Sequence, residues 1–279
     1  GLFNRTLEFG DEQVALIFPA TVDLPGFFVP AGHGWTEGLV RGRTFTPSPI
    51  AATVRDYVSG DSVAQVHWPS TAQRGKLMVK EFEREPSGPA DAVWVLIDLD
   101  DRVQGGQGAE SSVEYSVTIA GSVAKRFLDA GRTVGLVVNG EEQTIVRPGT
   151  GLEQMGRVLQ TLALAEPGRL GTILDAANMT AAELTRGASV VIVSSASPSE
   201  VASAGRVLEA YGAGVVPIIV EAASFDGAPP ARGGSYRLPG TAFDAYVVHA
   251  GDEIEQRLDY RVHGHGNVVN VALAQGGGR

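Results

Sequence analysis

Two hydrophobic patterns alternate along the last two thirds of this chain. Short, nearly continuous apolar runs are typical of β-strands that are covered on both faces. They occupy residues 92–97, 133–138, 189–193, 215–220 and 245–248. Between them, apolar residues recur at the spacing of one helix face. These residues are Val113, Val117, Ala120, Ala124 and Phe127, then Leu152, Met155, Leu159 and Leu162, and later Val201, Ala204, Leu208 and Tyr211. The pattern predicts strands that alternate with amphipathic helices.

Capping and turn residues mark several ends of these elements. Ser111 with Glu114 predicts a capping box, and Gly131 is placed to end the same helix. Ser197-Pro198-Ser199-Glu200 combines an N-cap, a proline at the first helical position and a capping acid. Asn139-Gly140 predicts a hairpin that leads into a strand over residues 143–146. Pro217 lacks the backbone donor that a central strand uses, so we expect its strand to lie at an edge or to begin late.

This alternation predicts the fold class, an α/β domain with a mostly parallel, doubly wound sheet and helices on both faces. The residues before it differ, because glycine, proline and threonine recur through Pro49 and break any helical pattern. Strands are expected there at residues 63–66 and 77–82. Pro86-Ser87-Gly88-Pro89 is the predicted boundary. We therefore expect a β-rich segment over residues 1–88, a partial β-domain, and the α/β domain over residues 89–279.

Composition narrows the classes of function. The 279 residues can bury a core, and a net charge of −10 argues against nucleic acid or an anionic membrane surface as the main partner. The absence of cysteine excludes disulfides and thiolate metal sites. No apolar run approaches the roughly 18 residues that a membrane-spanning helix needs. The chain reads as an ordinary globular protein whose charge suits basic patches on a protein partner.

An ordered run ahead of the α/β domain resembles a known family. Arg55, Tyr57, Gly60 and Asp61 form an R-x-Y-x-x-G-D run, and Trp68 follows a few residues later. This run resembles the domain-of-unknown-function 58 family, in which it precedes a von Willebrand factor A-like domain. Further matches are Ser70, Ala72, Gly75, Leu77, Val79, Glu81, Phe82 and Glu83, with Gly1-Leu2-Phe3 and Ile17-Phe18-Pro19 upstream. By themselves, the motif residues are compatible with a docking surface or with a tight turn at Gly60-Asp61 and a core position for Trp68.

The resemblance implies a role in protein interaction without catalysis. Members of the family are commonly encoded beside MoxR-type AAA+ ATPases, which implies an adaptor that serves such a chaperone. Members usually carry membrane helices ahead of this region. The resemblance therefore implies that this chain is a soluble fragment of a longer, membrane-anchored protein, and a cytosolic ATPase would place this part in the cytoplasm. Any membrane contact would come only through a segment absent from this chain.

Carboxylates follow the first strand of the α/β domain, where ligands bind to open parallel sheets. They are Asp98, Asp100 and Asp101. The resemblance implies a metal-ion-dependent adhesion site here, a D-x-S-x-S pattern completed by a threonine and an aspartate from later loops. Mg²⁺ prefers oxygen ligands in near-octahedral geometry. Asp98 matches the first position of the pattern, Thr150 is the candidate threonine, and Ser194-Ser195 stands where the later acid is expected.

The hydroxyl positions of that pattern hold Asp100 and Arg102, and a fixed cation is a poor substitute for a ligand oxygen. Two arrangements remain open. Arg102 pairs with Asp98 or Asp101 and the site is a degenerate one without metal, or Asp100 binds Mg²⁺ directly while Arg102 points to solvent. In both, we expect no other cofactor, and we expect a protein partner to bind through Asp101, Arg102, Ser194 and Ser195.

The rival class is an α/β hydrolase or nucleotide-binding enzyme that uses the same strand edge. Gly60-Asp61-Ser62 resembles the nucleophile block of the SGNH hydrolases, but it lies in the β-rich segment and has no evident histidine base. Gly106-Gln107-Gly108 hints at a dinucleotide fingerprint, but its third glycine position is Ser111. We therefore expect a protein that is not an enzyme.

Overall fold

A computed structural model describes residues 17–30, 53–56, 68–81, 92–185, 187–229 and 235–259. The chain divides into two units, Val40–Ser87 and the remainder, Gly1–Leu39 with Gly88–Arg279. The domain bounds expected from the sequence, residues 1–88 and 89–279, stay a prediction. Leu24 and Phe27 are buried in the core of the larger unit.

In the smaller unit, β1 (Thr53–Asp56) pairs antiparallel with β2 (Met78–Glu81), and α1 (Trp68–Arg74) lies between them in sequence. The strand expected at residues 77–82 is therefore present as β2. The strand expected at residues 63–66 lies outside the described residues.

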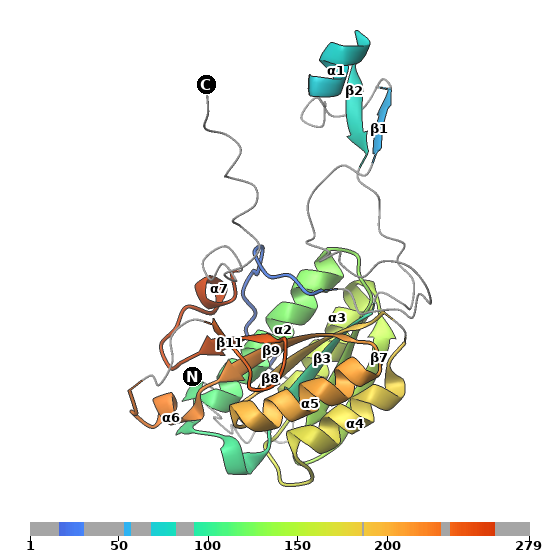
Figure 1. The fold of residues 1–279 in the computed structure, drawn as a ribbon. Helices are drawn as coiled ribbons and strands as arrows, with labels where there is room; N and C mark the ends of the chain where they lie inside the picture. The colour runs from blue at the N-terminus through green and yellow to red at the C-terminus, as the bar shows by residue number, and fades with distance from the viewer. Residues whose placement is uncertain are drawn as a thin grey trace, which may run out of the picture. The chain divides into compact units, whose positions relative to one another are not determined.

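The larger unit is built on a seven-stranded sheet in the order β10-β11-β9-β8-β3-β6-β7 (Figure 1). Its members are β3 (Val93–Asp98), β6 (Val134–Asn139), β7 (Gln143–Gly149), β8 (Ser189–Ser194), β9 (Gly214–Val220), β10 (Ser235–Arg237) and β11 (Asp244–Val248). The five central strands run parallel, and β10 and β7 are antiparallel edges. The predicted fold class, a mostly parallel α/β sheet, is confirmed.

Helices cover both faces of this sheet, as Figure 1 shows for α2 and α3 on one side and α4 and α5 on the other. Their bounds are α2 (Ser112–Asp129), α3 (Gly151–Ala163), α4 (Ile173–Glu183) and α5 (Pro198–Ala210). Short elements complete the unit: η3 (Asp101–Val103), β4 (Gly106–Gln107), β5 (Glu110–Ser111), α6 (Ala222–Phe225) and α7 (Ile254–Arg257). No helix in the described ranges is both long and apolar enough to span a bilayer.

Strand β3 shows why these apolar runs form strands. Val93, Val95 and Ile97 belong to the core under α2 and α3, whereas Trp94 and Leu96 belong to the core under α4 and α5. Alternate side chains of a strand point to opposite faces, so a strand covered on both sides must be apolar throughout. All six residues of β3 are buried, including Asp98 at its carboxyl end.

The predicted helix ends are largely confirmed. Ser197 and Glu200 form a complete capping box, with Pro198 at the start of α5. Ser111 caps α2, and Gly131 follows that helix with a φ of 77°. Helix α4 is not predicted from the sequence, although Thr172 and Asp175 form a second complete capping box at its start.

Pro217 lies in β9, and the expectation that this strand forms an edge is wrong, because β9 lies between β8 and β11. The register explains how the proline is tolerated. Strand β11 pairs only with Ile218–Val220, so the first four residues of β9 have a ladder partner on one side only. The missing N–H falls in that half of the strand, where a proline is least costly.

Candidate functional site

Strand order changes direction at β3. The chain passes from β3 to β6 on one side and later to β8 on the other, so the carboxyl ends of β3 and β8 meet at the switch point. Open α/β sheets place their ligands at this point. Asp98 ends β3, Asn139 ends β6 and Ser194 ends β8. The topology therefore gathers three polar residues at one edge, here called the carboxyl edge.

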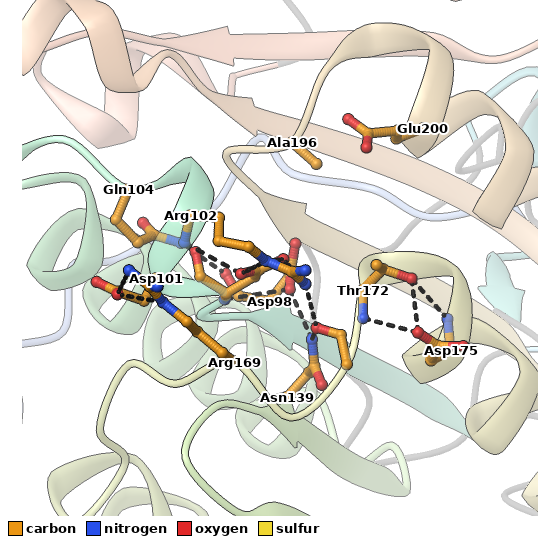
Figure 2. A network of polar contacts seen from close by, with 12 residues as sticks. Asp98, Asp101, Arg102, Gln104, Asn139, Arg169, Thr172, Asp175, Ala196 and Glu200 are labelled. Carbon is orange, nitrogen blue, oxygen red and sulfur yellow. Dashed lines mark hydrogen bonds and ion pairs between the residues drawn. The ribbon is translucent and has the colours of Figure 1, made fainter.

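Asp98 is fully buried and accepts hydrogen bonds from both flanking strands. Figure 2 shows Asp98 beside Asn139 of β6. Ser194 Oγ donates to Asp98 Oδ2 at 2.7 Å, and Asn139 Nδ2 donates to Asp98 Oδ1 at 2.8 Å. The backbone N–H of Asp100 also donates to Oδ1, at 3.4 Å. Burial raises the pKa of Asp98, and the hydrogen bonds from Ser194 and Asn139 only partly offset that effect. A buried carboxylate thus forms the centre of the edge.

Arg102 pairs with Asp100 instead of with Asp98 or Asp101, the partners expected from the sequence. Its Nε lies 2.8 Å from Asp100 Oδ1 and its Nη2 lies 2.7 Å from Oδ2, so the guanidinium grips both oxygens. Nη2 also reaches the carbonyl oxygen of Gly171 at 3.5 Å. The Arg102 side chain is 48% exposed, whereas the Asp100 side chain is only 7% exposed. A fixed cation therefore covers a buried carboxylate at the surface of the edge.

The electrostatics of this pair follow from its geometry. Burial alone would raise the pKa of Asp100, but the hydrogen bonds from Arg102 outweigh burial and lower it. The same bonds to Asp100 raise the pKa of Arg102, and the charges of Asp98 and Asp175 add to the effect. Both partners thus remain charged, and the pair supplies a permanent positive group beside Asp98.

Gln104 ties the loop after β3 to its neighbours. Its Nε2 donates to the carbonyl oxygens of Asp98 and Asp100, at 3.2 and 3.3 Å. Its Oε1 accepts from Ser112 Oγ at 2.7 Å and from Ser195 Oγ at 3.3 Å. The hydroxyl of Ser195 is therefore engaged within the site. Gln104 is a site residue that the sequence analysis misses, because an isolated glutamine has no distinctive spacing.

The loop between α3 and α4 crosses over the same edge. The Asp101 N–H donates to the carbonyl oxygen of Gly168 at 2.8 Å, and the Gly168 N–H donates to that of Leu99 at 3.1 Å. Arg169 pairs with Asp101, with Nη2 2.9 Å from Oδ2. A Cβ on Gly168 would lie 2.2 Å from the Glu141 Cα, so only glycine allows this close approach. This crossing loop places Arg169 and Leu170 on the exposed surface of the edge.

Two of the predicted site residues need correction. Thr150 follows Gly149, which lies opposite Val134, the first residue of β6. Asn139 and Asp98 lie at the other end, about 16 Å away along five residues of strand. Thr150 therefore lies at the opposite edge and cannot join Asp98 in one ligand set. Ser194 is fully buried with its hydroxyl on Asp98, so it supports the site and does not present a surface to a partner.

The threonine at the carboxyl edge is Thr172. It follows Gly171, whose carbonyl oxygen accepts from Arg102 and from Asn139 Nδ2, the latter at 3.2 Å. Its hydroxyl donates to Asp175 Oδ2 at 2.7 Å within the capping box of α4. The hydrogen bond from the Thr172 backbone N–H, followed by the one from its hydroxyl, lowers the pKa of Asp175. Figure 2 shows Thr172 turned toward Asp175.

These residues do not fit a Mg²⁺ site of the expected pattern. Asp100 binds a guanidinium, Arg102 stands in the third position, and Thr150 is at the other end of the sheet. A hard cation needs several oxygens that can face it together. No group of three or more acidic or histidine side chains suited to a metal ion occurs within the described ranges.

A second polar cluster lies farther along the edge, at the ends of β9 and β11. His249 Nδ1 lies 3.0 Å from Asp252 Oδ2, and His249 Nε2 lies 2.8 Å from Glu221 Oε2. Arg257 Nη2 donates to Asp252 Oδ1 at 2.8 Å. Burial alone would raise the pKa of Asp252, but the hydrogen bonds from Arg257 and His249 lower it. The histidine therefore faces carboxylates with both ring nitrogens.

Most residues of the sequence motif lie outside the part of the chain that can be described. Tyr57, Gly60, Asp61 and the candidate nucleophile Ser62 have no described structure. Arg55 lies in β1 and Trp68 begins α1, and only their backbone is described. Docking and structural roles for the motif both stay predictions.

Comparison with known proteins gives one family. The sequence model of the family described as "Protein of unknown function DUF58" matches residues 53–222. The chain is 31% identical over 118 residues to "Uncharacterized protein YeaD" of Bacillus subtilis (strain 168). That match covers 42% of this chain and 27% of YeaD, so the chain spans about a quarter of that relative's length.

Solved structures with a similar fold share little sequence. The VWA domain of SpRpn10 has a TM-score of 0.42 at 9% identity, over 61% of this chain and 94% of that one. The conserved hypothetical protein BatB of Bacteroides thetaiotaomicron has a TM-score of 0.33 at 14% identity, over 62% and 86%. The type V pili tip protein Mfa5 of Porphyromonas gingivalis has a TM-score of 0.31 at 14% identity, over 37% and 19%. These scores are below 0.5, and the fold assignment depends on the strand order described above.

Proposed function

Because this chain belongs to the family described as Protein of unknown function DUF58, we propose that it is a non-enzymatic protein-interaction module. It binds its partner through the carboxyl edge of the sheet, without a metal ion. The partner is a MoxR-type AAA+ ATPase, for which the chain acts as an adaptor. In the full-length protein, a membrane anchor outside this chain holds the module at the cytoplasmic face.

One observation carries the proposal: the polar groups at the switch point bind one another. Ser194 donates to Asp98, Ser195 donates to Gln104, and Arg102 is held by Asp100. A nucleophilic serine needs a base that accepts its proton. These two hydroxyls donate to a structural carboxylate and an amide, and His249 faces carboxylates on both sides. The arrangement supports a rigid docking surface over bond-making chemistry.

The exposed part of the edge suits protein contact. Arg169 is 70% exposed beside Leu170, which is 60% exposed, and Arg102 in η3 is half exposed at the same edge. Arginine is enriched among the residues that dominate binding energy at protein interfaces, and burial of an exposed apolar side chain beside it adds to that energy. Asp101 pairs with Arg169 and contributes to the same surface. These four residues, Asp101, Arg102, Arg169 and Leu170, form the surface that the partner would contact.

Binding to the purified ATPase tests the proposal directly. The chain is immobilised and titrated with a MoxR-type ATPase encoded beside its gene, with ATP or ADP present. Leu170→Asp should weaken binding at least tenfold, because it places a charge in the centre of the surface. Leu152→Asp is the matched control, since Leu152 is 89% exposed at the start of α3, at the opposite edge. Absence of binding, or equal loss in both variants, contradicts the proposal.

Two further measurements test the absence of a metal and of catalysis. Calorimetric titration with Mg²⁺ or Mn²⁺ should show no site that depends on Asp98, with Asp98→Ala as the control. Tight binding that disappears in this variant would contradict the metal-free edge. Ester and nucleotide substrates should show no turnover, and robust turnover that Ser62→Ala abolishes would establish the rival enzymatic function.

A further inference from the structure

A groove of about 330 Å³ opens beside the site described above. It lies at the carboxyl ends of β8, β9 and β11, and its lining includes Ser195, Ser197, Ile219, Glu221, Tyr236 and Val247. This volume is at the lower limit of the roughly 300–1,000 Å³ of small-molecule pockets. The groove therefore suits one side chain better than a large ligand. Asp98 and Arg102 are not among the residues that line the groove.

The lining combines an apolar floor with one acid. Ile219 and Val247 are buried apolar residues at the ends of neighbouring strands, and Tyr236 is partly exposed beside them. Glu221 is the ionisable carboxylate among the lining residues, and no lysine or arginine lines the groove within the part of the chain that the structure describes. Apolar lining residues with a carboxylate among them suit an amphipathic cation, whose aliphatic stem packs while its charged end pairs with the acid.

Glu221 is held in place from behind. His249, buried between two carboxylates, lies 2.8 Å from Glu221 Oε2, and the Glu221 N–H donates to the carbonyl oxygen of Val248 at 2.9 Å. The Glu221 side chain is nevertheless 21% exposed, and Glu221 is one of the residues that line the groove. A fixed, partly exposed carboxylate costs little further ordering when a cation binds.

The surrounding charge favours a cation. Near the groove, the start of α5 already has its anion, because Glu200 Oε2 accepts from the backbone N–H of Ser197 at 3.0 Å. The helix N-terminus is thereby satisfied within the chain and does not need an external anion. Among the described residues of the carboxyl edge, carboxylates outnumber guanidinium groups: Asp98, Asp100, Asp101, Asp175, Glu200, Glu221 and Asp252 stand against Arg102, Arg169 and Arg257.

We propose that this groove receives a lysine or arginine side chain of the protein partner. The aliphatic stem lies on Ile219 and Val247, and the cationic end pairs with Glu221. This inference depends on the proposed function, because it names the chemistry by which the same edge recognises its partner. The overall charge of −10 attracts a basic partner surface toward the edge before contact.

Nuclear magnetic resonance with small probes tests the groove itself. The ¹⁵N-labelled chain is titrated with N-acetyl-lysine methylamide, with its norleucine analogue and with its glutamate analogue. The lysine probe should shift the amide signals of Ser195–Ser197 and Glu221–Ala223 at millimolar concentration. The norleucine probe should bind about fivefold more weakly, as for loss of one exposed ion pair. Equal shifts with the norleucine or glutamate probe, or none at the groove, would overturn the proposal.

Variants separate charge from shape. Glu221→Gln should weaken the lysine probe about fivefold, and Ala223→Trp should abolish its shifts by filling the groove. Glu209→Gln removes the same charge from the far end of α5 and should have no effect. If one groove variant folds poorly, the other still tests the proposal. Lysine binding that is unchanged in the folded groove variants would overturn it.

The ATPase experiment then distinguishes this inference from the proposed function. If the ATPase binds and Leu170→Asp weakens it while Glu221→Gln and Ala223→Trp do not, the proposed function stands and the groove is wrong. If the lysine probe binds the groove but no ATPase binds, the groove stands and the ATPase partner is wrong. If sedimentation shows that the two groove variants abolish self-association instead, the occupant is a second copy of this chain and a separate partner is excluded.

Discussion

Arg102 grips Asp100, two residues before it, through Nε at 2.8 Å and Nη2 at 2.7 Å. Asp100 is buried, and Asp98 lies next to it with no cation in hydrogen-bond contact among the described residues. The guanidinium therefore provides the positive charge that two neighbouring carboxylates need at one strand end. Because this cation belongs to the chain, we expect partner binding at the proposed docking surface not to depend on metal concentration.

Replacing Arg102 by serine should create affinity for a divalent cation. The variant removes the fixed charge and leaves two carboxylates with a hydroxyl, which are the oxygen ligands that Mg²⁺ and Mn²⁺ prefer. We expect Mn²⁺ to bind Arg102→Ser at least tenfold more tightly than the wild-type chain. Calorimetry or Mn²⁺ electron paramagnetic resonance measures this difference.

The control for that prediction is the double variant with Asp98→Ala. It should lose the new affinity, because Asp98 is the carboxylate at the end of β3 that would face the ion. Arg169→Ser removes an arginine from the same edge without opening the Asp98 site, and it should gain nothing. Equal Mn²⁺ affinity in Arg102→Ser and Arg169→Ser would exclude Arg102 as the replacement for a metal.

Asp98→Ala should lower the free energy of unfolding by about 3 kcal/mol, because it leaves the buried donors of Ser194 and Asn139 without an acceptor. Urea denaturation at pH 7 measures this loss. Asn178→Ala is a matched control for a surface polar change, since Asn178 is exposed on α4 and its amide donates only to the carbonyl oxygen of Leu174 within that helix. A loss below about 0.5 kcal/mol for Asp98→Ala, the range of ordinary surface changes, would contradict the buried network.

Asp98 should also leave a signature in the pH dependence of stability. Burial raises its folded-state pKa above the ordinary value of 3.8, so the folded state binds more protons in the window above 3.8. Its contribution to stability therefore falls as pH rises through that window. Compared with Asp98→Asn, the wild-type chain should lose relative stability between pH 4 and pH 7. Urea denaturation of both proteins across this range measures the free energies of unfolding. A wild-type chain that gains stability relative to Asp98→Asn as pH rises would contradict the raised pKa.

The sequence predicts the sheet well because burial on both faces leaves an unambiguous pattern. Runs such as 92–97 and 190–193 are apolar at every position, whereas a strand with one face in solvent alternates apolar and polar residues. Helix α4 escapes the prediction because alanine, its main buried residue, gives a weak amphipathic contrast. Its start signal is present, however, in Thr172 and Asp175, which form the capping box.

The site is predicted only in part. The position of Asp98 follows from strand order alone, since carboxyl ends of parallel strands meet at one edge. The Thr150 assignment is wrong for a reason that the sequence also holds: a hairpin after Asn139 reverses β7 and carries Thr150 to the other edge. The Arg102–Asp100 pair and the role of Gln104 depend on side-chain geometry in a loop, which residue spacing does not determine.

Asp252→Asn should lower the free energy of unfolding by about 1–2 kcal/mol at pH 7, because Arg257 and His249 lose a charged acceptor. The folded-state pKa of Asp252 lies below 3.8, so its stabilisation is present above pH 3.8 and is lost as pH falls through the lowered pKa. The difference between wild type and variant should thus shrink from pH 7 to pH 3. Asp129→Asn, which breaks an exposed pair with Lys125, should cost much less.

Two glycines should respond oppositely to alanine. Gly135 lies in β6 against the Trp94 ring, and an added Cβ would be 2.7 Å from the Trp94 Cε3. Gly135→Ala should therefore lower the free energy of unfolding by about 1–3 kcal/mol through overpacking. Gly156 is exposed within α3, where an added Cβ meets no atom within 4 Å, so Gly156→Ala should raise it by about 1 kcal/mol. Thermal or urea unfolding of both variants measures the contrast, and the same sign in both would contradict the packing of Trp94 against β6.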